Sequence, residues 1–202
     1  MSVARKIPLV AAVLASAGSL ALSAPAATAQ VETGPWTSVS PGYSVQQQGC
    51  GTVSGLTMSL SCSSASGVQR AERRYDTYCD GVRQFQGTFR INSMSGNRIS
   101  LKQTFGPSDA DFMLAVDSSR RLYSVRNGGA TIAPAGTAAN GVSVTVNTVH
   151  SGSEHRIYIN GSSRLKYAGL SGCHYDKFGA YRTDSGAGPI SVTWSNIRFW
   201  RR

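Results

Sequence analysis

The chain has 202 residues and carries 20 Lys and Arg against 10 Asp and Glu, a formal net charge of +10. Once the N-terminal segment is set aside, the chain is long enough for one domain with a hydrophobic core and too short for two domains of ordinary size. The positive charge indicates an anionic partner, such as an acidic glycan, and carries no information about the fold.

The first 29 residues have the organisation of a secretory signal peptide. Arg5 and Lys6 precede an apolar run that extends to about residue 24, and Ala27-Thr28-Ala29 fits a cleavage motif before Gln30. The apolar run is too short and too interrupted by Ser and Gly to predict a membrane span. We therefore expect a secreted, extracellular monomer without membrane association. Residues 30–202 then form one domain, and loss of the two basic residues lowers the net charge from +10 to +8.

The remainder of the chain is predicted to be entirely β. No window of 11 or more residues shows the apolar spacing of a helix, whereas short alternating runs recur with Asn-Gly and Ser-Gly turn sequences between them. About ten such strands predict two antiparallel sheets packed face to face as a β-sandwich or jelly roll. Ala130–Ala139 has no period and is predicted to form a surface loop. The predicted strands are Leu56–Ser61, Gln84–Asn92, Asn97–Phe105, Phe112–Val116, Leu122–Val125, Val142–Val149, His155–Ile159, Lys177–Arg182 and Ile190–Trp200.

The chain contains four cysteines, Cys50, Cys62, Cys79 and Cys173. An even number in an exported protein indicates two disulfides, which four cysteines can form in three ways. The sequence contains no Cys-x-x-Cys pair and no other recognisable cluster of metal ligands, so we expect neither a metal centre nor a cofactor.

The segment Arg70-Ala71-Glu72-Arg73-Arg74 is highly charged. On a strand with a period of two, Arg70, Glu72 and Arg74 lie on one face. Two guanidinium groups beside one carboxylate leave a net positive charge that suits a carboxylate or sulfate ligand. The same pattern also fits a solvated ionic ladder, and in either case the arginines are expected to keep Glu72 ionised.

Gln103 is the polar member of an otherwise apolar strand face. Strict alternation over Asn97–Phe105 places it beside Ile99, Leu101 and Phe105. A glutamine in this setting is either a satisfied polar group at a sheet margin or a hydrogen-bond donor in a groove.

The segment Tyr175–Arg182 predicts a strand with two different faces. Phe178 and Ala180 suit a core. The opposite face carries an ammonium group, two phenols and a glycine that other groups can approach closely: Tyr175, Lys177, Gly179 and Tyr181. This polarity indicates a binding face, and an ordinary amphipathic strand with exposed tyrosines is the alternative.

In this order, the three segments resemble the sequence blocks of the alginate lyases of polysaccharide lyase family 7 and, more loosely, of the related glucuronan lyases. The family blocks read Arg-x-Glu-x-Arg, Gln-Ile/Val-His and Tyr-Phe-Lys-Ala-Gly-x-Tyr. The chain matches every fixed position of the first block and the glutamine of the second block. It also matches the third block, in which Asp176 and Phe178 occupy variable or substituted positions. Phe105 stands where the family has histidine. The resemblance spans most of Val68–Arg202 and implies a concanavalin-like jelly roll.

The resemblance implies cleavage of a uronate polymer by β-elimination. Removal of the C5 proton creates an enolate, so the reaction needs donors at the substrate carboxylate, a base for the proton and an acid for the departing oxygen. By resemblance, Arg70 and Gln103 neutralise the carboxylate, and Tyr181 is the acid and, in a syn-elimination, also the base. The other block residues are implied to bind the polymer: Arg74, Glu72, Lys177 and Tyr175.

Phe105 cannot replace the family histidine, which is the base for one substrate stereochemistry and helps to grip the carboxylate. Either Tyr181 acts alone, another histidine substitutes, or the groove binds without cleaving. His174, beside the third block, is the better substitute unless its role is structural. His150 and His155 lie near a predicted hairpin and are expected at the surface.

The resemblance also implies one of the three disulfide pairings. In such a jelly roll the first and third blocks lie on the same concave sheet. Cys79, just after the first block, and Cys173, just before the third, can then meet at a sheet end. This leaves Cys50 and Cys62 as a local disulfide.

Other functions fit the residues less well. A glycoside hydrolase needs two carboxylates facing one bond, and residues 30–202 contain only three glutamates, Glu32, Glu72 and Glu154. The sequence contains no Gly-x-Ser-x-Gly nucleophile elbow and no recognised nucleic-acid-binding module, so a nucleic-acid partner is not expected. A non-catalytic carbohydrate-binding or cell-surface protein that uses the same basic groove is the main alternative.

Overall fold

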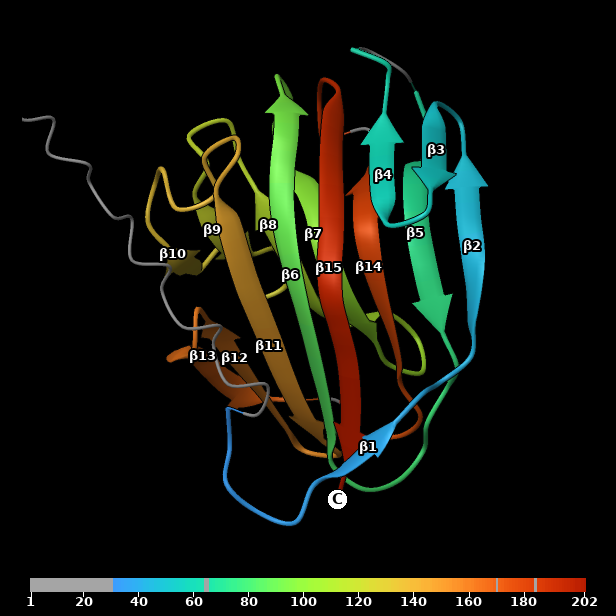
Figure 1. The fold of residues 1–202 in the computed structure, drawn as a ribbon, viewed down its shortest axis with the longest axis vertical. Coiled ribbons are helices and arrows are strands. Elements are labelled where there is room, and N and C mark those ends of the chain that lie inside the picture. Colours follow the sequence, from blue (N-terminus) through green and yellow to red (C-terminus); the bar gives the residue numbers. More distant parts are fainter. Residues whose placement is uncertain (1–30, 64–65, 170, 184) are drawn as a thin grey trace, which may run out of the picture.

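The computed structural model describes residues 31–63, 66–169, 171–183 and 185–202, in which the regular elements are β-strands (Figure 1). The predicted signal peptide lies outside these residues. Within them, no helix has the length and apolar character needed to cross a membrane. The strands are β1 (Thr37–Val39), β2 (Tyr43–Gln48), β3 (Gly51–Ser54), β4 (Thr57–Leu60), β5 (Gln69–Tyr75), β6 (Arg83–Met94), β7 (Ile99–Phe105), β8 (Ala110–Val116), β9 (Leu122–Ser124), β10 (Thr131–Ala133), β11 (Ser143–Ser151), β12 (Glu154–Ile159), β13 (Ser162–Ala168), β14 (Tyr175–Arg182) and β15 (Ile190–Arg201).

The strands form two antiparallel sheets that lie face to face (Figure 1). The first sheet has the order β13-β12-β11-β6-β15-β4-β3, and β1 pairs with β15 beside this path. The second sheet has the order β10-β9-β8-β7-β14-β5-β2. This arrangement confirms the predicted all-β sandwich of two antiparallel sheets.

Each strand predicted from alternation is present, with ends that differ by a few residues. The strands that were not predicted include β2 and β13, which are mostly exposed and polar. Edge strands of this kind lack the apolar period on which the prediction depends. The prediction of a surface loop over Ala130–Ala139 is wrong for Thr131–Ala133, which forms the edge strand β10 and buries Ile132. Three residues are too few to display a period.

The apolar core fills the space between the two sheets. Phe178 of β14 lies 4.8 Å from Trp194 of β15 and 6.0 Å from Phe85 of β6, measured between ring centroids. Each of the three side chains is 1% exposed. Because aromatic side chains bury the largest apolar areas, these contacts across the sandwich determine which face of β14 points inward.

A buried ion pair also lies on the core side of the second sheet. Lys102 Nζ, on β7, donates hydrogen bonds to Asp176 Oδ1 at 2.5 Å, to Thr104 Oγ1 at 3.0 Å and to the Gln103 carbonyl oxygen at 2.9 Å. Lys102 is 0% exposed and Asp176 is 5% exposed. Burial alone would raise the pKa of Asp176, but the charge and hydrogen bond of Lys102 lower it. Asp176 therefore stays ionised and supplies the counter-charge.

Both disulfides form in the predicted pairing. Cys50–Cys62 joins the turn after β2 to the segment after β4. Cys79–Cys173 joins residues 94 positions apart, beside the backbone bridge between Tyr78 and His174. A link across so long a loop restricts the unfolded chain and so favours the folded state.

Replacement of Asp176 by asparagine should destabilise the protein through Lys102. The variant preserves side-chain size but leaves a fully buried ammonium group without its counter-charge, so the free energy of unfolding should fall by about 3–5 kcal/mol. Urea denaturation at pH 7 measures this loss. The control Asp80→Asn removes a largely exposed partner of Arg83 and should change the free energy by less than about 1 kcal/mol. Equal effects in the two variants would contradict the role assigned to the buried pair.

Candidate active site

The three charged segments lie side by side in the second sheet. β14 pairs with β5 along one edge and with β7 along the other. In this register Tyr181 is opposite Arg70, and Lys177 lies between Arg74 and Gln103. The residues that alternate with them belong to the core: Ala71, Phe178 and Ala180. The charged residues therefore lie on the side of β5, β7 and β14 that points away from the first sheet, which we call the outer face.

A β-bulge in β7 separates Gln103 from two residues that were predicted to share its face. The pairing of β7 with β8 shifts register within residues 100–102. Ile99 and Leu101 belong to the core and are 0% and 1% exposed, whereas Gln103 contacts Glu72 on the outer face. The prediction of one shared face is wrong at this point because a bulge adds a residue to one strand and interrupts strict alternation.

Gly179 lies where β14 passes close to β5. It pairs with Glu72 and has a φ of 150°, and a Cβ at this position would lie 2.2 Å from the Ala71 carbonyl oxygen. A larger residue would force the two strands apart and change the relation between Tyr181 and Arg70.

Glu72 is the centre of a polar cluster on the outer face. Gln103 Nε2 donates a hydrogen bond to Glu72 Oε1, and Lys177 Nζ lies 4.0 Å from Glu72 Oε2. Glu72 and Gln103 are each 1% exposed, and Lys177 is 5% exposed. These residues form the floor of the outer face. The bond to Glu72 orients the Gln103 amide, whose nitrogen carries a second hydrogen.

Arg70 and Tyr181 are half-buried neighbours at one end of this floor. Arg70 Cζ lies 5.4 Å from the centroid of the Tyr181 ring, and Arg70 Nη1 lies 3.5 Å from Gln46 Oε1. Arg70 Nε is buried and makes no hydrogen bond within the described residues. Because the contact of Nη1 with Gln46 is long, the terminal nitrogens of the guanidinium group retain donor capacity for an anion beside the phenol.

Phe105 and Tyr175 form a stacked pair at the other end. Their ring centroids are 5.2 Å apart, and the rings are tilted by only 5°. Lys177 Nζ lies 4.7 Å from the Phe105 centroid, and Arg74 Cζ lies 4.0 Å from the Tyr175 centroid. Phe105 thus makes a cation–π contact with Lys177, which stabilises the packing of the two side chains but cannot transfer a proton.

The ionisation of Glu72 differs from the prediction. Burial raises the pKa of Glu72 from 4.5 to about 7, against the lowering effects of Lys177, Arg70 and the hydrogen bond from Gln103. The prediction that the neighbouring arginines keep Glu72 ionised is wrong because burial outweighs them. Near neutral pH the carboxyl group is partly protonated, and the outer face carries more net positive charge than the sequence alone suggests.

Burial also shifts two other groups on the outer face. It raises the pKa of Tyr181 above 10, and the opposing charge of Arg70 only partly offsets this effect. It lowers the pKa of Lys177 below 10.5 despite the nearby Glu72, and Arg70 and Arg74 act in the same direction as burial. At neutral pH Tyr181 retains its proton, so its hydroxyl can act as a proton donor.

A pocket beside Tyr181 brings to the candidate site residues that no sequence motif marks. Phe105 and Tyr181 form part of its wall, together with Arg98 and with Arg126, which pairs with Asp109. Arg98 precedes β7, and Arg126 follows β9. These residues belong to different loops and follow no common spacing, so only the folded sheet reveals that they line one pocket.

All three histidines lie in the interior. The prediction that His150 and His155 are surface residues is wrong, because they pair across the β11–β12 hairpin and are 3% and 0% exposed. His174 is 0% exposed, and its Nε2 lies 3.4 Å from Asp111 Oδ2. It immediately precedes Tyr175, and strand alternation directs the two side chains to opposite sides of the sheet. His174 is therefore not placed to substitute for the family histidine on the outer face.

The fold is similar to that of known alginate lyases. Alginate lyase AlgAT5 from polysaccharide lyase family 7 matches with a TM-score of 0.58 and 19% identity, over 72% of this chain and 78% of that one. The alginate lyase from Corynebacterium sp. matches with a TM-score of 0.60 and 15% identity, over 71% and 75%. AlyA1, a marine family 7 alginate lyase from Zobellia galactanivorans, matches with a TM-score of 0.58 and 18% identity, over 75% and 80%. No protein-family model and no curated protein sequence matches the chain. The chain thus has the jelly-roll fold that its three sequence blocks implied.

Glu72→Gln should remove a pH-dependent loss of stability. Glu72 has a pKa of about 7 in the folded protein and an ordinary value of 4.5 in the unfolded chain, so between these pH values the folded state binds more protons and stability falls as pH rises. The difference corresponds to a loss on the order of 3 kcal/mol across this window. Urea denaturation of both proteins at pH 4.5 and pH 7.5 measures the change in slope.

The control for this experiment is Glu154→Gln. Hydrogen bonds from Lys166 and Arg156 lower the pKa of Glu154, so its contribution to stability is lost only as pH falls below 4.5. This control should leave the slope between pH 4.5 and 7.5 unchanged. A slope that Glu72→Gln also leaves unchanged would show that burial does not raise the pKa of Glu72.

Proposed function

We propose that this protein is a secreted polysaccharide lyase that cleaves an acidic, uronate-containing polysaccharide by β-elimination. The observation that carries this proposal is the position of Tyr181 opposite Arg70, with Gln103 on the same outer face. Together these residues offer a proton donor and two groups that bind a carboxylate. The similarity to alginate lyases supports the same reaction class.

The proposed role of Arg70 and Gln103 is to bind the substrate carboxylate. When C5 loses its proton, negative charge moves onto this carboxylate, and donors already held in position stabilise it without further reorganisation. The Arg70 guanidinium group contacts Gln46 through Nη1 at only 3.5 Å, and the Gln103 amide nitrogen, oriented by Glu72, carries a second hydrogen. Both groups therefore have donors to offer. Arg74 and Tyr175 extend the binding surface toward a neighbouring sugar.

Lys177 and Glu72 set the charge beneath this surface. The Lys177 ammonium group lies against the Phe105 ring and near Glu72, so we assign it an electrostatic contribution more than direct contact with the polymer. A protonated Glu72 leaves the Lys177 charge uncompensated and favours an anionic substrate. Ionisation of Glu72 as pH rises past about 7 adds a negative charge and weakens that attraction.

Tyr181 is proposed to transfer the protons. The hydroxyl first loses its proton to solvent, and the resulting phenolate takes the C5 proton. A double bond then forms between C4 and C5, and the bond from C4 to the glycosidic oxygen breaks. The same hydroxyl then delivers the proton to the departing oxygen. The raised pKa suits the donor step, and the adjacent Arg70 charge favours the phenolate needed for the first step. We therefore expect kcat to increase as pH rises above neutral.

Secretion is part of the proposal. The signal-peptide pattern of residues 1–29 and the two disulfides both suit an oxidising compartment outside the cytoplasm. A net charge of +8 after cleavage suits an anionic polymer, and we propose that the protein acts on it as a monomer.

Phe105 favours one alternative function. Because a phenylalanine occupies the position of the family histidine and packs on Tyr175, the same outer face could bind an acidic polysaccharide without cleaving it. A non-catalytic carbohydrate-binding protein would retain affinity for uronate polymers and release no product.

The mature protein should release unsaturated uronate products from at least one polymer in a panel of alginate, glucuronan and glycosaminoglycans. Ultraviolet absorbance of the product measures the reaction. Tyr181→Phe should lower kcat at least about 1000-fold, within the range for loss of an acid–base group, while binding measured by calorimetry changes less than about threefold. The control Tyr158→Phe removes a hydroxyl of the first sheet that donates a hydrogen bond to Glu32, and it should leave kcat unchanged.

Two results would reject parts of this proposal. Binding without product on every polymer would establish the non-catalytic alternative. Full activity of Tyr181→Phe would show that another group transfers the protons.

Phe105→His should broaden the range of polymers that are cleaved. In the resembling family, a histidine at this position is the base for one substrate stereochemistry, and the pocket beside Tyr181 would place it near the same sugar. We expect cleavage of a polymer that the unaltered protein leaves intact, measured by the same absorbance assay. The control Phe105→Leu removes the ring without adding a base and should gain no substrate. A folded histidine variant with an unchanged substrate range would contradict this role of Phe105.

A further inference from the structure

The three histidines of the chain meet one aspartate between the two sheets. His150 of β11 and His155 of β12 come from the first sheet, Asp111 of β8 comes from the second, and His174 directly precedes β14. Their exposed fractions are 3%, 0%, 7% and 0%. These residues are dispersed in the sequence with no metal-ligand spacing, so only the fold brings them together.

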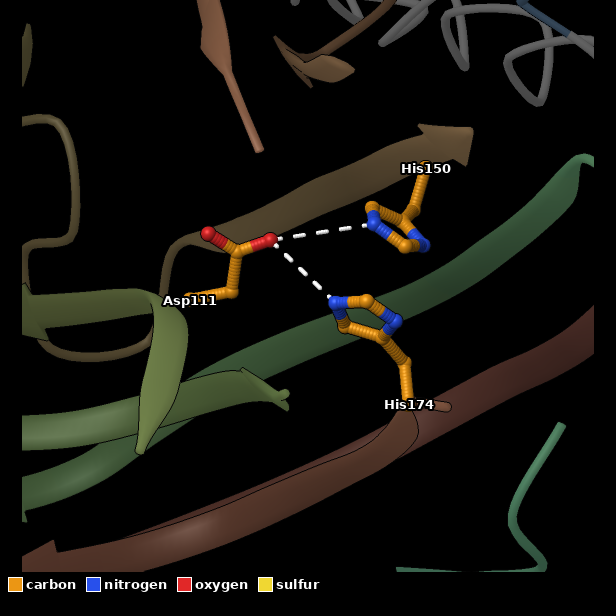
Figure 2. Close-up of side chains that lie close together, drawn as sticks. All are labelled: Asp111, His150 and His174. Atoms are coloured by element: carbon orange, nitrogen blue, oxygen red, sulfur yellow. Dashed lines mark ion pairs between the residues drawn. The ribbon is translucent and has the colours of Figure 1, made fainter. Parts of the chain in front are cut away.

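The distances within this cluster are short. Asp111 Oδ2 lies 3.0 Å from His155 Nε2, 3.4 Å from His174 Nε2 and 3.7 Å from His150 Nε2. Figure 2 shows the rings of His150 and His174 directed at the same carboxylate. One ligand atom each from Asp111, His150 and His174 lie within 4.8 Å of one another. Zinc bonds of about 2.0–2.2 Å in a tetrahedral site would separate such atoms by about 3.3 Å, which a modest contraction achieves.

The hydrogen bonds of His174 define where its lone pair points. Its Nδ1 lies 2.9 Å from the Gly172 carbonyl oxygen, which can only accept, so Nδ1 carries a hydrogen. In the neutral ring Nε2 then presents a lone pair toward the Asp111 carboxylate. The Nε2 atoms of His150 and His174 make no hydrogen bond of normal geometry within the described residues. A cation placed between the two rings and the carboxylate would give both Nε2 atoms a partner.

We propose that Asp111, His150 and His174 bind one divalent transition-metal ion, of which zinc fits best. Two imidazole nitrogens and a carboxylate suit zinc, whereas calcium and magnesium prefer oxygen ligands. His155 Nε2 lies 3.0 Å from Asp111 Oδ2 and packs beside the carboxylate, and Tyr78 and Gly172 contact the outer nitrogens of the two ligand rings. The ion would connect the two sheets on the side of the second sheet opposite Tyr181, which assigns it a structural role.

Zinc binding can be measured on the mature protein with both disulfides intact and without a histidine tag. After treatment with a chelator and dialysis, ZnCl₂ should bind at one ion per chain in equilibrium dialysis with elemental analysis. An excess of zinc about a hundredfold above Kd should raise Tm by about 5 °C or more. CoCl₂ should produce the visible absorption bands of a low-symmetry, near-tetrahedral site.

Substitutions identify the ligands. His150→Gln and His174→Gln should each weaken zinc binding more than about 100-fold and abolish the cobalt bands, whereas His155→Gln should weaken it about 10–100-fold. The control Glu154→Gln, next to His155 on β12 but paired with Lys166 and Arg156, should bind normally.

Two outcomes would overturn the proposal. The first is the absence of stoichiometric zinc binding and of a Tm increase in the unaltered protein. The second is binding that survives in folded His150→Gln and His174→Gln variants. If these variants do not fold, the stoichiometry and cobalt spectrum of the unaltered protein decide the question by themselves.

Discussion

Strand β14 is hydrogen-bonded to β5 along one edge and to β7 along the other, and its two faces carry opposite kinds of side chain. Phe178 packs against Trp194 in the core, whereas Lys177 and Tyr181 lie on the outer face. A shift of one residue would exchange the two faces, so burial of Phe178 also determines that Tyr181 lies opposite Arg70. The packing of the sandwich and the geometry of the candidate site therefore depend on the same register.

Asp176 and Lys177 are neighbours on this strand, and each belongs to a buried ion pair. The two pairs respond differently to burial. Asp176 faces the core, where its 2.5 Å contact and the further hydrogen bonds of Lys102 keep the carboxylate ionised. Lys177 faces outward and lies 4.0 Å from Glu72, too far to offset the cost of burying that carboxylate, whose pKa rises to about 7. Close contact makes the first pair a permanent structural charge. The longer separation makes the second pair sensitive to pH near neutrality.

The sequence predicts those features that depend on local alternation. Long strands with an apolar period, such as β6 and β15, are recognisable, and so is the placement of Arg70, Glu72 and Arg74 on one face of β5. Polar edge strands such as β2 have no such period. The bulge in β7, the raised pKa of Glu72 and the burial of the histidines result from contacts between distant segments. None of these contacts leaves a pattern in a single stretch of sequence.

The burial of every histidine restricts the chemistry available on the outer face. Without an imidazole there, the proposed elimination must use a group that can both lose and return a proton, and Tyr181 is the one placed beside Arg70, the proposed carboxylate ligand. A single group that takes a proton and then delivers it can serve only one side of the sugar ring. The proposed reaction is therefore limited to uronates whose C5 hydrogen and C4 oxygen lie on the same side. Phe105, which cannot take a proton from the other side, then becomes a determinant of substrate stereochemistry.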